Sequence, residues 1–178
     1  MAAFFSTLGR LLGGDVPQDY KVADVYSGMR EMILTISPEK LPILKDKPIY
    51  AVLVEMGRPG AAVTMMTVAD GAASLYFSNG GGIIGLGEHE NVRKESLEFI
   101  RLSSQFLPQM KKVSIYPLPK PDQTQFYIIT PDGIYTHFAQ DSDIEKQSHP
   151  LFPLWSKAQD VITQMRITDE RRKAEQGH

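Results

Sequence analysis

Two Asp-Gly dipeptides constrain the fold of this 178-residue chain more than any other feature of its sequence. Asp70-Gly71 and Asp132-Gly133 each lie between two runs of strand-forming residues. The runs are residues 63–68 and 73–77 around the first dipeptide, and residues 126–129 and 134–138 around the second. Asp-Gly supplies the positive backbone dihedrals that a tight hairpin turn needs. The sequence therefore predicts two β-hairpins, whose strands must be antiparallel.

Three segments carry apolar residues at steps of three and four, the spacing of helices with one buried face. The face of the first is Val22, Val25, Tyr26, Met29, Met32, Ile33 and Ile36. The stripe of the second is Val92, Ser96, Phe99, Ser103 and Phe106. This second helix begins near Glu90 and is kinked or ended by Pro108. The third helix spans Leu151 to Met165, and Pro150 and Pro153 suit its entrance and first turn.

Two more apolar runs, Ile49 to Met56 and Val113 to Tyr116, are predicted strands. The predicted fold class is α+β, with a central antiparallel sheet of about six strands and three main helices in the order α-β-β-β-α-β-β-β-α. Residues 1–18 are an apolar N-terminal extension, residues 19–167 one domain, and residues 168–178 a charged tail that we expect to be disordered.

The composition narrows the classes of function. The formal net charge is -2, so no overall basic field attracts nucleic acid. The chain has no cysteine, which excludes disulfides and thiolate chemistry and is compatible with the reducing cytoplasm. No apolar run approaches the roughly 18 residues of a transmembrane helix. The sequence therefore predicts a soluble, cytoplasmic protein without nucleic-acid partners.

The order of elements resembles that of known folds. The residues that carry this resemblance are the hairpin Thr64 to Phe77, the helix that follows it, and the segment Thr130-Pro-Asp-Gly-Ile-Tyr135. In this order the chain resembles the profilin-like group of folds, and within it roadblock-type and longin-type domains. This resemblance implies a protein-interaction or scaffold module that is often dimeric and has no intrinsic catalysis.

A glycine-rich loop is the first candidate site. Gly80, Gly82 and Gly85 match the pattern G-x-G-x-x-G, whose backbone amides can hold a phosphate before a helix. Glu88 and Glu90 follow at once, and their negative charge opposes an anion. A structural loop is the favoured interpretation and a ligand-binding loop the alternative. The candidate ligand-binding residues are Asn79, Gly80, Gly81, Gly82, Gly85 and Arg93.

Catalytic and metal-binding residues are not indicated by the sequence. His89 lies between two glutamates, but consecutive residues rarely converge on one metal ion, so a capping role is favoured. His137 is placed at the rim of a strand, with no carboxylate or nucleophile paired to it. We therefore predict no catalytic residues, no metal and no cofactor.

The N-terminal extension carries a short apolar stripe that needs a cover. Its residues are Phe4, Phe5, Leu8, Leu11 and Leu12, the candidate partner-binding set. Together with the sheet edges, this stripe predicts self-association, with a homodimer as the expected form. The predicted function is a non-enzymatic protein-interaction, regulatory or scaffold module. The alternative is a binding protein for a small ligand that uses the loop from Gly80 to Gly87.

Overall fold

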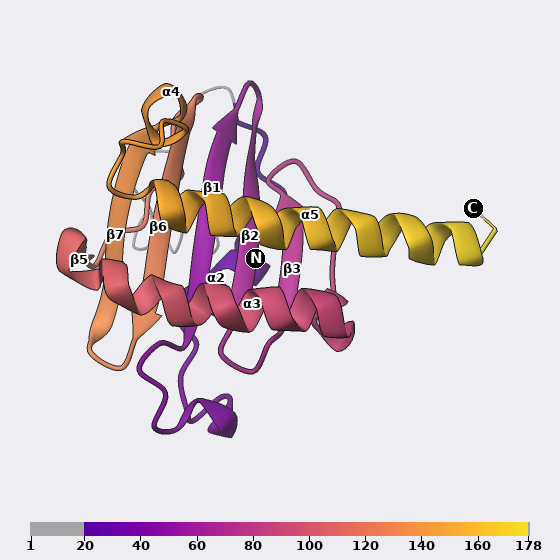
Figure 1. The fold of residues 1–178 in the computed structure, drawn as a ribbon, viewed down its shortest axis with the longest axis horizontal. Helices are drawn as coiled ribbons and strands as arrows, with labels where there is room; N and C mark the ends of the chain where they lie inside the picture. Colours follow the sequence, from indigo (N-terminus) through magenta and orange to yellow (C-terminus); the bar gives the residue numbers. More distant parts are fainter. Residues whose placement is uncertain (1–19, 178) are drawn as a thin grey trace, which may run out of the picture.

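The computed structural model describes residues 20–177, which form a single antiparallel sheet flanked by helices (Figure 1). The seven strands lie in the order β4-β3-β2-β1-β6-β7-β5. Their bounds are β1 Ala51–Arg58, β2 Ala61–Val68, β3 Ala73–Phe77, β4 Gly82–Ile83, β5 Lys111–Val113, β6 Gln123–Thr130 and β7 Gly133–Gln140. The predicted α+β class and antiparallel sheet are confirmed, and the seventh strand is the two-residue β4 inside the glycine-rich loop.

The helices cover both faces of this sheet. Helices α3 and α5 pack side by side across one face, and α2 lies on the other (Figure 1). The bounds are α2 Asp24–Leu34, α3 Glu90–Ser103, α4 Asp141–Ile144 and α5 Phe152–Glu175. Three short 3-10 segments join them, η1 Pro42–Leu44, η2 Leu86–Glu88 and η3 Ser104–Gln109. No helix in residues 20–177 is long and apolar enough to cross a membrane.

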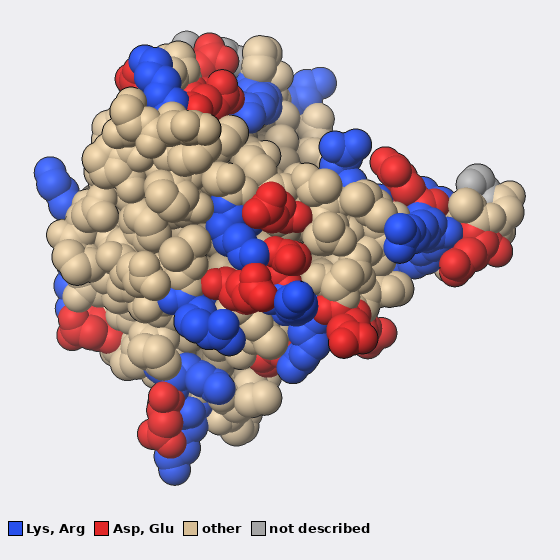
Figure 2. All heavy atoms as spheres, in the orientation of Figure 1, with Lys and Arg blue, Asp and Glu red and all other residues tan. Residues whose placement is uncertain are grey.

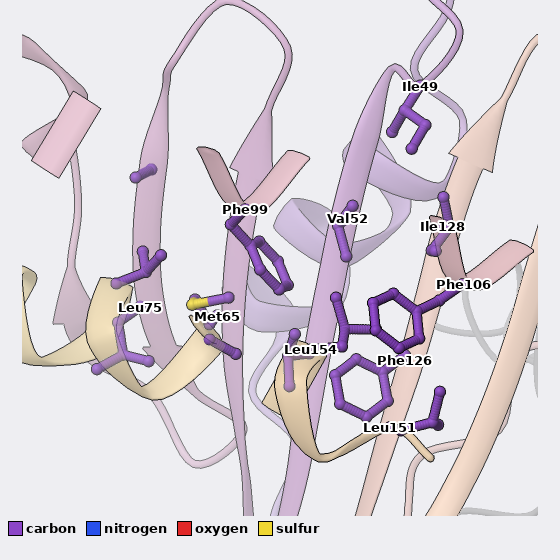
Figure 3. Packing of buried hydrophobic residues seen from close by; sticks show 14 of the residues in the cluster. Ile49, Val52, Met65, Leu75, Phe99, Phe106, Phe126, Ile128, Leu151 and Leu154 are labelled. Atoms are coloured by element: carbon purple, nitrogen blue, oxygen red, sulfur yellow. The ribbon is translucent and has the colours of Figure 1, made fainter. Parts of the chain in front are cut away.

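The larger core lies between the sheet and the pair α3 and α5. Figure 3 shows Phe99 of α3 and Leu154 of α5 in this layer, with Val52 and Phe126 from the sheet. All members of the stripe predicted for the second helix are buried: Val92, Ser96, Phe99, Ser103 and Phe106. The α-helical part ends at Ser103, and the chain continues as the 3-10 segment η3, which contains Pro108.

Both hairpins form as predicted, but glycine alone supplies the positive φ values. Strand β2 pairs with β3 and β6 with β7 across the two Asp-Gly turns. Gly71 has φ of 92° and Gly133 of 130°, whereas neither aspartate of the turns is among the described residues with positive φ. Asp70 instead accepts a hydrogen bond from the Ala72 N–H on its Oδ1, at 2.8 Å. Asp70 therefore contributes to its turn through its side chain, and not through a positive φ.

Strand β5 and helix α5 differ most from their predicted boundaries. Strand β5 spans Lys111–Val113, earlier than the predicted run from Val113 to Tyr116. Helix α5 continues to Glu175 through the segment expected to be a disordered tail. Asp169 is buried there and pairs with both Arg172 and Lys173, at 2.7 Å in each case. These pairs at i+3 and i+4 favour the helix where the apolar stripe has ended.

Figure 2 shows the face of the molecule that carries α3 and α5. Lysines, arginines, aspartates and glutamates alternate over it rather than gathering by sign. Lys157 of α5, for example, lies between Glu95 and Glu98 of α3 and pairs with both. The face shown therefore has no basic stripe of the kind that follows a nucleic-acid backbone.

Candidate functional site

The glycine-rich loop forms the cover of one sheet edge. Gly82 of β4 pairs with Tyr76 of β3. A Cβ atom at Gly82 would lie 2.5 Å from the Leu75 carbonyl oxygen. A Cβ at Gly87 would lie 2.5 Å from the Gly71 carbonyl oxygen, in the turn before β3. Glycine is required at both positions because the backbone lies directly against β3 or the turn that precedes it. The loop thus covers an edge strand that would otherwise expose its backbone groups.

The residues predicted to bind a ligand are only partly brought together. Asn79, Gly80, Gly81 and Gly82 form the tight connection between β3 and β4. Arg93 lies elsewhere, with its guanidinium against Gly71 in the turn between β2 and β3. Gly85 precedes the 3-10 segment η2, which separates the loop from the first residue of α3, Glu90. Ligand binding at this loop stays a prediction.

The other sequence-derived candidates fall into two groups. Phe4, Phe5, Leu8, Leu11 and Leu12 lie outside the described residues. His89 is at the N-cap of α3 but makes no side-chain capping bond. His137 is half-buried, and its Nδ1 atom is 3.0 Å from the Gln109 carbonyl oxygen. Within residues 20–177, no three His, Cys, Asp or Glu side chains converge where they could hold a metal ion.

A buried ion pair joins α2 to the centre of the sheet. The Nε of Arg30 donates to Oε1 of Glu55 at 2.6 Å, and its Nη2 donates to Oε2 at 3.0 Å. Nη2 also donates to the Tyr116 carbonyl oxygen at 2.8 Å. The Glu55 side chain is 0% exposed and that of Arg30 is 11% exposed. A bidentate arrangement of this kind fixes both position and direction of the two side chains.

Polar residues continue from Glu55 along neighbouring strands. The register pairs Tyr76 with Thr64, Thr64 with Glu55, and Glu55 with Gln125. These residues form a polar row across the α2 face of the sheet. Tyr26 of α2 bonds to this row, with its hydroxyl 2.8 Å from the Thr64 Oγ1.

The tyrosines around the ion pair are held in their neutral form. Burial raises the pKa of Tyr26, Tyr76 and Tyr127 well above the ordinary value, and the negative charge of Glu55 raises it further. The Arg30 guanidinium lies 5.7 Å from the ring centroid of Tyr127, a cation–π contact that adds to its attachment. In this cluster of Arg30, Glu55 and the tyrosines, the carboxylate is paired and the phenols are neutral. The cluster therefore suits a structural role, which is to hold α2 in position on the sheet.

The attachment turns one apolar stripe of α2 away from the sheet. Tyr26 and Ile33 are buried, as the predicted helix face requires, but Val25 is 60% exposed and Met32 is 56% exposed. Met29 and Ile36 are partly buried and pack against the core under α2. The predicted single buried face is therefore wrong for two of its seven members, Val25 and Met32. We call these two residues, with Gly28 between them, the outer stripe of α2.

Apolar periodicity does not predict the ion pair, because both segments follow apolar patterns. The signal in the sequence is a single carboxylate inside the apolar run from Ile49 to Met56, and a single arginine between Tyr26 and Ile33 at helical spacing. Opposite charges in two otherwise buried patterns indicate a pair, since an unpaired buried charge is costly.

Comparison with protein-family models, with curated proteins and with solved structures finds no match for this chain.

Proposed function

We propose that the chain is a non-enzymatic protein-interaction module that self-associates through the outer stripe of α2. The observation that carries this proposal is the exposure of Val25 and Met32 on a helix whose orientation is fixed by a buried ion pair. Large apolar side chains that are fixed in an exposed position gain free energy when a partner covers them. The absence of cysteine supports a cytoplasmic location.

A second copy of the chain suits this stripe. Val25 and Met32 are seven residues apart, about two turns of α2, so both lie on the outward side of the helix. Gly28 lies on the outward side of the helix, with no atom within 4 Å of a Cβ built there, so a neighbouring helix can approach closely. The net charge of -2 gives little repulsion between copies. Two such helices related by a two-fold axis bury the same stripe on each copy.

Light scattering coupled to size exclusion tests the proposal with the full chain over a range of concentrations. The wild type should show the mass of a dimer, and Met32→Glu should shift it to the monomer. Ile84→Glu is the matched control, because Ile84 is also 56% exposed but lies in the glycine-rich loop. A monomeric wild type, or a dimer that both variants leave unchanged, contradicts the proposal.

A further inference from the structure

One edge of the sheet is covered and the other is open. The β3 edge is covered by β4 and η2, whereas β5 is the last strand in the order and has no described strand on its outer side. An edge strand of this kind leaves a row of backbone N–H and C=O groups without partners from the sheet. These groups can pair with an added strand.

The charge of this open edge disfavours a second copy of the chain. Lys111 and Lys112 are both exposed, so two of the three residues in β5 are basic. A symmetric antiparallel pairing centred on Lys112 would place this lysine opposite its own copy. Like charges directly opposite one another destabilise paired strands.

A shallow, open depression lies beside the same edge. Lys112, Val113, Ser114 and Ile115 line it. Ile115 is 58% exposed. Lys111, at the beginning of β5, is part of no ion pair among the described residues, whereas Lys112 pairs with Asp132 at 3.2 Å. The edge therefore combines an open backbone, the exposed apolar side chain of Ile115 and a lysine without an ion pair among the described residues.

We propose that the outer edge of β5 binds an extended acidic peptide of a partner protein by strand addition. The peptide backbone pairs with the outward groups of β5, an apolar side chain packs on the exposed Ile115, and a neighbouring carboxylate meets Lys111. This surface lies on β5 and shares no residue with the outer stripe of α2, so the two proposals stand or fall separately.

Fluorescence anisotropy with the full chain and a labelled seven-residue peptide of alternating glutamate and valine tests this proposal. We expect saturable binding that weakens as salt is added, because surface charges are screened. A peptide with the same side chains but N-methylated backbone amides should not bind, since it cannot add as a strand. A peptide of alternating lysine and valine should bind much more weakly.

Two variants separate the edge from the overall charge of the protein. Lys111→Glu should weaken binding roughly fivefold, in keeping with the strength of exposed ion pairs and an added repulsion. Lys45→Glu makes the same change of charge on an exposed residue of the α2–β1 connection and should bind like the wild type. Circular dichroism checks that both variants are folded.

Several results would overturn the proposal. Equal binding of the N-methylated peptide would exclude strand addition, and equal loss in both variants would show a non-specific charge effect. No binding at about 1 mM peptide would exclude a useful affinity. A lower solution mass of Lys111→Glu would show that the edge pairs with a second copy instead.

Discussion

Removal of Arg30 should expose how strongly the chain depends on its buried ion pair. In Arg30→Met, the fully buried carboxylate of Glu55 keeps only one hydrogen-bond partner among the described residues, the Thr64 hydroxyl at 3.5 Å. Removal of one partner of a buried pair costs about 3–5 kcal/mol, because the other charge remains without compensation. This is a large share of the roughly 5–15 kcal/mol that stabilises a typical domain.

Urea unfolding followed by circular dichroism measures this cost. With a slope of about 2 kcal/mol per molar urea, the midpoint of Arg30→Met should fall by roughly 1.5–2.5 M. The double variant Arg30→Met with Glu55→Met should recover most of the loss, since an apolar pair of similar volume is often close to neutral in place of a buried ion pair. Arg58→Met removes a more exposed pair with Asp141 and should cost less than about 1 kcal/mol.

The double-mutant cycle gives the decisive comparison. A cost below about 1 kcal/mol for Arg30→Met would refute the inference that this pair is energetically buried. A double variant that loses the sum of the two single losses would show that the residues act independently. Either result would remove the argument that the pair fixes the orientation of α2.

Three further predictions concern glycines and tyrosines. Gly28→Ala should raise the free energy of unfolding by about 1 kcal/mol in urea melts, because the helix gains alanine and the site is open; a loss would contradict the open outer surface of α2. Gly57→Ala should lower it by about 2 kcal/mol or more, because the new Cβ would overlap the Lys120 carbonyl oxygen; an unchanged midpoint would contradict this close approach. Burial raises the pKa of Tyr26, Tyr76 and Tyr127 above the unfolded value of about 10, so the stabilisation by these neutral phenols is complete below that pH and is lost as pH rises beyond it. Absorbance at alkaline pH should show that these three ionise only when the chain unfolds, and ionisation of all seven tyrosines with one common pKa in the folded chain would disprove it.

Local patterns predicted the parts of the fold that depend on neighbours in sequence. The stripe from Val92 to Phe106 and both Asp-Gly hairpins have their causes within a few residues, and all three form as predicted. The extent of α5 was not predicted, because the pattern of apolar residues ends near Met165. The helix continues on the ion pairs of Asp169, whose partners on the next turn are also local but were not weighed.

The candidate sites depend on tertiary contacts, so the sequence predicted them less well. The glycines at positions 80, 82 and 85 match a phosphate-binding pattern, but at Gly82 the glycine is required by contact with β3, a strand outside the pattern. Arg30 and Glu55 are 25 residues apart and meet only when α2 lies across the sheet. Periodicity predicted that α2 has an apolar side, but it could not predict which part of that side faces the sheet.

Polar contacts accompany the orientation of α2. Val25 and Met32 face outward, while Tyr26 and Ile33 of the same helix are buried. The rotation observed is the one that brings Arg30 to Glu55 and Tyr26 to Thr64. A buried ion pair can select one arrangement without adding net stability. The double methionine variant separates these two effects, because it should keep the free energy of unfolding while it removes the bonds that select the rotation. If its solution mass falls to that of the monomer at unchanged stability, the pair acts by presenting the outer stripe; if it remains a dimer, packing alone orients α2.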